Sequence, residues 1–158
     1  MSITNQIAKH IRDIYFGGNW TFSNLKENLA DVTWKEAITR VDNCNTIAAL
    51  VFHINYFVRA VLQVLHGNPL TANDRYSFDV PLISSEDDWQ KLLEQTWNEA
   101  EQFASLVEQL PDSILYETFS DEKYGNYYRN FHGIIEHSHY HLGQIVILKK
   151  VLRNTSAN

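Results

Sequence analysis

The sequence predicts an all-α protein with four main helices, arranged as either an up-and-down or a crossover bundle. Only 6 Gly and 3 Pro interrupt 158 residues that are 44% hydrophobic and 20% charged, which is typical of long helices with few turns. Apolar residues recur every three or four positions over long segments, as one buried face of a helix requires. The length favours a single domain over residues 1–158.

The first helix is predicted from Ile3 to about Tyr15, because the isoleucines at positions 3, 7, 11 and 14 share one face. Gly17-Gly18 ends it. An aromatic-rich connection that includes Trp20 follows. We expect this connection to contain a short helix after Ser23 and to fold over one end of the bundle.

The second helix is predicted to run to His66, with Asn43 or Asn45 as its N-cap, because a short polar side chain there accepts a hydrogen bond from a first-turn amide. Gly67-Asn68-Pro69 ends this helix. The polar segment from Leu70 to Ser85 has little periodicity. A connection of that length usually crosses a bundle or borders a site.

The third helix is predicted to begin at Ser84 or Ser85, because the acidic residues that follow suit the positive end of a helix dipole. Pro111-Asp112 closes it. The last helix is predicted to begin near Tyr127, after a connection through residues 121–126. Both helices carry long apolar stripes, so both belong to the core.

Charge and cysteine content restrict the partners and the compartment. The formal net charge of -6 would repel a phosphate backbone, so nucleic acid is not an expected partner. Cys44 is the single cysteine, and the N-terminus lacks the apolar stretch of a leader, so we expect a cytoplasmic protein. The most apolar stretch, residues 47–65, is predicted to be a buried helix rather than a membrane span because it carries His53, Asn55, Arg59 and Gln63.

Three of the seven histidines are predicted to meet inside the bundle. His137 and His141 are four residues apart, so on a helix they project from one side, about 5–6 Å apart at Cβ. They lie on the apolar stripe of the last helix and therefore point towards the core. His53 lies midway along the second helix, where an unpaired ring nitrogen would cost about 1–3 kcal/mol. In an antiparallel or crossover bundle it can face the last helix.

A site of three histidines would bind one divalent transition metal and leave a coordination position open, as catalytic zinc sites do. Zinc or nickel is expected, and iron or manganese would also accept imidazole ligands. Core packing of the pair is the alternative, since an HxxxH pair alone is weak support for a metal. His139 is expected to be exposed, and His10, His66 and His132 have no partner at a useful spacing.

The sequence around the histidine pair resembles a known family. The run from His137 to Ile145, HSHYHLGQI, is similar to the HxxYHxGQI pattern of the DinB-like (damage-inducible, YfiT-like) proteins. His53 in Phe52-His53-Ile54 is similar to the family's second-helix histidine, and Trp20 fits its usual aromatic residue after the first helix. The resemblance covers nearly the whole chain, and the run that begins at His137 is its most specific part.

The resemblance implies a DinB/YfiT-like four-helix bundle with a crossover connection and a divalent metal on His53, His137 and His141. Related families include thiol S-transferases that use bacillithiol or mycothiol, and a mycothiol-dependent maleylpyruvate isomerase. We therefore expect an S-transferase that joins a low-molecular-weight thiol to an electrophilic small molecule. The alternatives are a metal-dependent hydrolase and a non-catalytic, stress-related metal- or ligand-binding module. Analogy with the family also suggests a homodimer.

Several residues near the pair are candidates for supporting roles. Gln144, three residues after His141, would hydrogen-bond near the ligands or face solvent. Tyr56 and Tyr140 are candidate donors near the site, although aromatic packing is their more common role. Gly143 would allow close approach of another helix or a dimer partner, or is simply tolerated at a cost of about 1 kcal/mol. The sequence identifies no general base.

Overall fold

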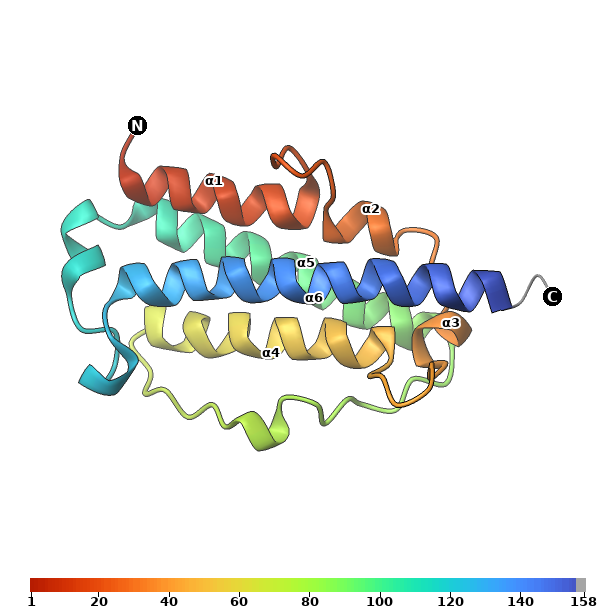
Figure 1. Ribbon diagram of the computed structural model, residues 1–158. Helices are drawn as coiled ribbons and strands as arrows, with labels where there is room; N and C mark the ends of the chain where they lie inside the picture. The colour runs from red at the N-terminus through yellow and green to blue at the C-terminus, as the bar shows by residue number, and fades with distance from the viewer. Residues whose placement is uncertain (156–158) are drawn as a thin grey trace.

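The computed structural model describes residues 1–155, and its elements are helical. Four helices are long (Figure 1): α1 (Ile3–Phe16), α4 (Ile47–Leu65), α5 (Glu86–Gln109) and α6 (Tyr127–Thr155). The short elements are the helices α2 (Leu25–Leu29) and α3 (Trp34–Ile38) and the 3-10 turns η1 (Asp74–Tyr76), η2 (Asp112–Tyr116) and η3 (Glu122–Tyr124). No strand forms among the described residues, so the predicted all-α class is confirmed.

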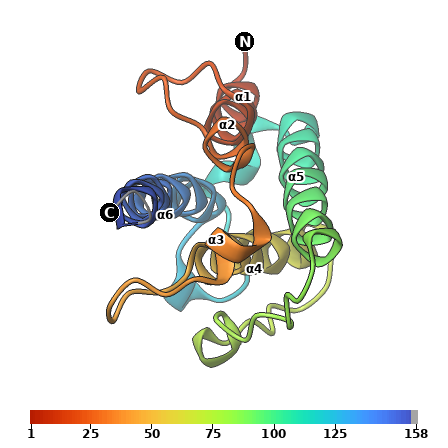
Figure 2. The same cartoon turned by 90° about the vertical axis from the view of Figure 1, so that its right-hand side faces the viewer.

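The long helices lie side by side around one core. α1 contacts α5 and α6, and α4 contacts the same two helices, so each long helix has two long neighbours. The end-on view places α1, α5, α4 and α6 at successive corners (Figure 2). The two faces of α6 that meet α1 and α4 are therefore both turned towards the interior.

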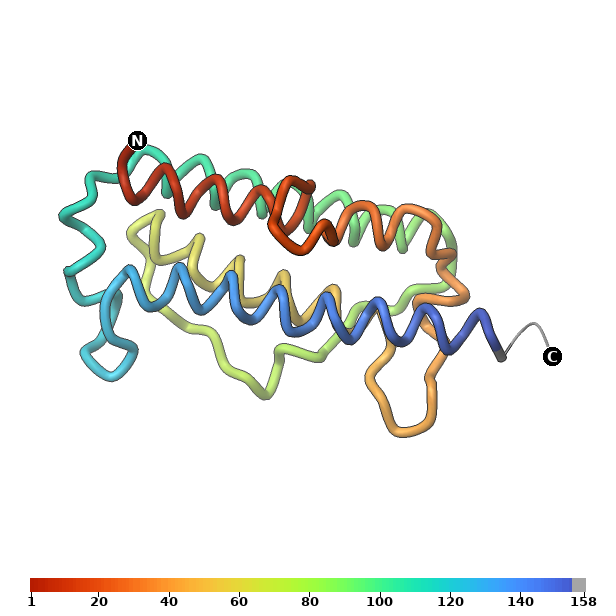
Figure 3. Tube along the Cα trace, turned by 45° about the horizontal axis from the view of Figure 1, so that its top comes forward, coloured from red at the N-terminus to blue at the C-terminus, as the bar shows by residue number. Residues whose placement is uncertain are grey.

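The chain crosses the molecule lengthwise between α4 and α5. These two helices run in the same direction, while α1 and α6 run in the opposite one (Figure 1). Residues 66–85 therefore return along the length of the molecule beside α4, and Figure 3 shows this course as a continuous trace. η1 lies within this crossover segment, so the crossover brings side chains to the middle of α4 rather than to its ends.

The helix ends follow from local capping. Ser85 caps α5 as predicted, because its side chain accepts a hydrogen bond from a first-turn amide. The prediction for α4 is wrong: Thr46 makes this bond rather than Asn43 or Asn45, since it directly precedes the first helical residue. α1 ends at Gly17, whose φ of 107° is a conformation that side chains disfavour.

The buried core is apolar, and its largest fully buried side chains include Trp89, Phe103 and Phe131. Among the described helices, α4 has the length and composition that would also suit a membrane span. In the folded chain, 61% of that apolar window is buried against the other elements. This burial fits the predicted role of α4 as a core helix.

The connection after α1 departs from the prediction in one respect. It contains the expected short helix, α2, whose Leu25 and Leu29 are buried. Trp20 and Phe22, however, are each 93% exposed. Two consecutive glycines with positive φ turn the chain outward, so this loop projects from the surface instead of folding over one end (Figure 2).

Candidate metal centre

The three predicted histidines lie together between α4 and α6. Nε2 of His137 lies 3.0 Å from Nε2 of His53 and 3.0 Å from Nε2 of His141. His53 and His141 are 8% and 7% exposed, and His137 is half-buried at the edge of a cavity. The rings converge because two of them are one turn apart on α6 and the third projects from the middle of α4. The structure thus contains the predicted cluster.

No arrangement of protons on the three neutral rings turns every short nitrogen contact of the cluster into a hydrogen bond. Nδ1 of His141 lies 2.7 Å from the side-chain oxygen of Gln144, which only accepts, so His141 carries its N–H on Nδ1. Its Nε2 then directs a lone pair at His137. Nε2 of His137 can either donate one hydrogen bond or accept one, so in neutral rings one of its two 3.0 Å contacts is not a hydrogen bond.

These features fit a divalent transition metal. Imidazole nitrogens whose lone pairs face one point are the ligands that zinc, nickel and iron accept in proteins. Ligand distances of about 2.0–2.1 Å allow two nitrogens on one ion to lie up to about 4 Å apart. The two contacts of 3.0 Å fall inside this limit, and the ligand atoms of all three residues lie within 4.8 Å of one another, so His53, His137 and His141 could hold a metal ion.

Two phenylalanines pack the rings. Phe78, from the crossover, stacks on His53 with centroids 3.9 Å apart and planes 8° from parallel. Phe57, one turn after His53 on α4, meets the edges of His53 and His137 at 5.1 and 5.0 Å. The outer nitrogens, Nδ1 of His53 and of His137, are buried without a hydrogen-bond partner. Within residues 1–155, Gln144 therefore provides the one side-chain hydrogen bond to an outer nitrogen of the cluster.

The surroundings favour neutral imidazoles, the form that binds metals. Burial lowers the pKa of His137 to about 4, and the neighbouring charges of His141 and His53 act in the same direction. Burial also lowers the pKa of His53, while the Ser77 backbone and the Asp74 carboxylate oppose this shift. Because a metal competes with protons for these nitrogens, the lowered pKa values keep them available near neutral pH.

The two tyrosines predicted near the site occupy different positions. The Tyr56 hydroxyl donates to the Asn73 carbonyl oxygen at 3.0 Å and accepts from the Asn73 amide at 2.8 Å. It thereby ties the crossover to α4 rather than facing the rings. Tyr140 is 65% exposed, and its ring meets the edge of His141 at 4.9 Å. A Cβ at Gly143 would meet nothing within 4 Å, so packing among the described residues does not require glycine there.

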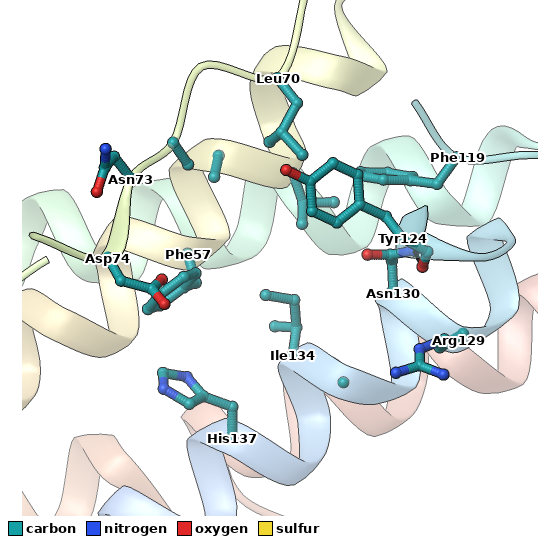
Figure 4. A pocket seen from close by; sticks show the side chains of 14 residues that line it. Phe57, Leu70, Asn73, Asp74, Phe119, Tyr124, Arg129, Asn130, Ile134 and His137 are labelled. Carbon is teal, nitrogen blue, oxygen red and sulfur yellow. Dashed lines mark hydrogen bonds between the residues drawn. The ribbon is translucent and has the colours of Figure 1, made fainter. Parts of the chain in front are cut away.

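Sequence reasoning missed Asp74 and Phe78, which the crossover brings to the site. The Asp74 carboxylate faces the cavity beside Phe57 and His137 (Figure 4). It forms no ion pair or hydrogen bond with residues 1–155. The polar crossover has no periodicity that fixes which of its side chains meet α4. The one sequence signal for Asp74 and Phe78 is the expectation that so long a connection borders a site.

One prediction for the remaining histidines is wrong. His139 is half-buried rather than exposed, because α1 packs against α6 and brings the His10 ring to 6.1 Å from it. His10 therefore has a ring partner that sequence spacing could not reveal. His132 contacts Tyr128, with ring centroids 4.3 Å apart.

A cavity of about 590 Å³ adjoins the cluster at His137. Its walls come from α4, α6, the crossover and the segment between α5 and α6: Phe57, Ala60, Val61, Leu70, Ala72, Asn73, Asp74, Phe119, Tyr124, Arg129, Asn130, Gly133, Ile134 and His137. The volume lies within the range of about 300–1,000 Å³ that is usual for small-molecule sites. The cluster and the cavity together can present a reactive centre to a small molecule.

Comparisons of the chain with protein-family models, with curated proteins and with solved structures found no match. The resemblance to the DinB-like proteins therefore stays a prediction from His53 and the run that begins at His137.

Proposed function

We propose that the chain is a DinB-like four-helix bundle with a crossover connection and that it acts as a metal-dependent enzyme on small molecules. His53, His137 and His141 would hold one divalent transition metal. The observation that carries the proposal is the convergence of their Nε2 atoms, with contacts of 3.0 Å, at the wall of a cavity of about 590 Å³. When bound, the ion would supply positive charge that lowers the pKa of a coordinated thiol or water.

The first candidate reaction is transfer of a low-molecular-weight thiol. The thiol loses its proton, its sulfur bonds to an electrophilic carbon of the second substrate, and the leaving group departs with the bonding electrons. Asp74 borders the cavity and would accept the thiol proton, while Phe57 and Phe78 limit access of water to the rings. The resemblance around His137 supports this candidate.

The same carboxylate supports hydrolysis as the second candidate. The Asp74 carboxylate lies on the same cavity as His137, forms no hydrogen bond or ion pair with a described residue, and acts on His53 through its charge. It would accept a proton from water while the water oxygen bonds to the carbon of the scissile bond. That bond would then break, and the leaving group would depart with the bonding electrons and take up the proton. A non-catalytic binding module would use the metal and the cavity but would not depend on Asp74.

Elemental analysis of protein purified without added metal tests the metal site. We expect close to one transition-metal ion per chain, and loss of that ion in His137→Ala. His66→Ala is the matched control, because His66 is exposed at the end of α4 and lies outside the cluster. A folded chain that carries no such ion, and takes up neither zinc nor nickel on addition, would contradict the proposal.

Two measurements separate the candidate reactions. Bacillithiol or mycothiol should change the visible absorption spectrum of the cobalt-substituted protein if the site binds a thiol. In the hydrolase, Asp74→Asn should lower the turnover of an activated ester by about 10²–10⁴-fold without changing the metal content. A protein that shows neither effect while still binding metal would be the non-catalytic module.

That the partner of this protein is a small-molecule substrate is part of the proposed function. The cytoplasmic location, the homodimer and the lack of nucleic-acid or membrane partners stay predictions from the sequence.

A further inference from the structure

The cavity beside the histidine cluster carries opposite charges at its two ends. His137 and the Asp74 carboxylate lie at one end, and Arg129 and Asn130 lie at the other (Figure 4). The walls between them are apolar and include Phe57, Leu70, Phe119 and Ile134. A ligand that fills this space therefore meets a mainly apolar environment with one cationic group away from the cluster.

Gly133 lies on the α6 wall of this cavity. A Cβ at this position would meet nothing within 4 Å, so no close contact requires glycine, and its φ is not in the positive range. Glycine in the middle of a helix is less favourable than alanine by about 0.5–1 kcal/mol. The absence of a side chain at Gly133 leaves open space in the cavity. This space explains the choice of glycine only if a ligand occupies it.

Arg129 is a cation without a protein partner. Its guanidinium forms no ion pair or hydrogen bond with residues 1–155, although the chain carries an excess of acidic residues. Its stem lies close to Gly125, where a Cβ would come within 2.9 Å of Cδ of Arg129. Gly125 also has a φ of 75°, so both the backbone conformation and the nearby Arg129 stem favour glycine at this turn.

We propose that the cavity binds small molecules with an apolar body and a terminal carboxylate. The carboxylate lies on Arg129, the body lies over Gly133 between the apolar walls, and the reacting end reaches the histidine cluster. Arginine suits this role because its planar fork matches both oxygens of a carboxylate. Asp74 at the opposite end disfavours the reversed orientation, since it would bring two carboxylates together.

This inference rests on the proposed function for the identity of the reacting end, but the binding step does not require the metal. The probe is 4-phenylbutyrate, with 4-phenyl-1-butanol as the analogue that lacks the charge. We expect the native chain to bind the acid at least 10-fold more tightly than the alcohol, in both zinc-loaded and metal-free forms. In Arg129→Gln the two probes should bind equally, because only the acid uses the guanidinium.

Arg40→Gln is the matched control, since it removes one exposed arginine that does not line the cavity. It should keep the preference for the acid. A native chain that binds both probes equally, or an Arg129→Gln variant that keeps the preference, would overturn the proposal. A preference that disappears with the metal but not with Arg129 would overturn it too, because the carboxylate would then lie at the cluster.

A second pair of variants tests the body of the ligand. Gly133→Leu should fold, bind zinc as the native chain does, and lose at least 10-fold in affinity for both probes, because its side chain fills the open space. Gly143→Leu is the control, since Gly143 is the other α6 glycine with open space around it and does not line the cavity. Unchanged probe binding in a folded Gly133→Leu variant would contradict the proposal.

Glutathione serves as a second probe, because it is a polar thiol that also carries carboxylates. Comparing it with 4-phenylbutyrate shows which kind of carboxylate compound binds at Arg129. If glutathione depends on Arg129 and 4-phenylbutyrate does not, the inference about the substrate is wrong. Metal content measured on the same samples keeps the two proposals apart. A native chain that binds no metal would contradict the proposed metal-dependent activity. Binding of 4-phenylbutyrate that depends on Arg129 could still be measured in that chain, so the inference about the ligand would be tested separately.

Discussion

The α1–α5 side of the core and the α4–α6 side differ in how their buried polar groups are satisfied. On the first side, the Trp89 indole N–H donates to a backbone carbonyl at 2.8 Å, and the hydroxyls of Thr4 and Thr96 donate to backbone carbonyls at 3.0 and 2.8 Å. On the second side, two buried atoms in the described chain lack any partner: Nδ1 of His53 and Nδ1 of His137.

This difference in hydrogen bonding suggests that one side of the core serves stability and the other serves ligand binding. A buried polar group without a partner costs about 1–3 kcal/mol, so the α4–α6 side is less stable than apolar packing would make it. An ion on the Nε2 atoms would leave both Nδ1 atoms without partners, but its binding to the folded chain would add stability that offsets this loss. No buried atom of this kind lies between α1 and α5 among the described residues. Changes on the first side should therefore act on the whole fold, and changes on the second side should act through the ligand.

The largest effect is expected from a fully buried core residue of α5 that lies outside the histidine cluster. Phe103 is fully buried on α5 and meets the edge of Phe131 at 5.6 Å. Phe103→Ala should lower the free energy of unfolding by about 3–5 kcal/mol, because it leaves a cavity in a closely packed core. Urea unfolding should give the same loss with zinc and with chelator. A loss that depends on zinc would mean that the two sides are coupled.

Metal binding should give the next largest effect, and it should be confined to the α4–α6 side. Zinc at 100 times its dissociation constant should raise the free energy of unfolding by about 2.7 kcal/mol, and chelator should remove this gain. His53→Ala should abolish the response while His66→Ala keeps it. A native chain whose unfolding is the same with zinc and with chelator would show that the cluster is ordinary core packing.

The two sides also differ in how much the sequence could predict. Helical periodicity predicted the long helices of both sides and the shared face of His137 and His141, because spacing on a helix fixes which side chains share a face. His53 was added because the second helix can face the last one in such a bundle, and the family resemblance selected the same residue. Periodicity could not predict that Asp74 and Phe78 meet the cluster, since an irregular crossover has no such rule. The His10–His139 contact was missed for a related reason: it depends on how α1 rotates against α6.

A smaller effect should come from the hydrogen bond behind one ligand. Gln144→Leu removes the acceptor for Nδ1 of His141, which orients the ring. Loss of such a partner typically weakens metal affinity by 10–100-fold, which corresponds to about 1.4–2.7 kcal/mol. Gln102→Leu, at an exposed position of α5, should leave the affinity unchanged. Equal affinities for zinc in the two variants would show that the bond does not support the ligand.

The smallest effect should be the pH dependence of the metal-free chain. Burial lowers the pKa of His137 to about 4 in the folded protein, against about 6.5 in an unfolded chain. The unfolded chain therefore binds more protons between these values, and the free energy of unfolding falls as the pH is lowered from about 6.5 towards 4. Because the ring is only half-buried, we expect a loss on the order of 1 kcal/mol.

A variant identifies the source of this loss. His137→Leu removes the titrating ring and its unpaired Nδ1, so its unfolding in chelator should depend less on pH across this window, whereas His66→Leu should behave as the native chain does. Carboxylates act in a lower range: hydrogen bonds from Arg153 and Lys149 lower the pKa of Asp31 to about 2, so its contribution is lost only below about pH 4. If His137→Leu and the native chain lose stability in parallel between pH 6.5 and 4, the cluster is not what makes the α4–α6 side sensitive to acid.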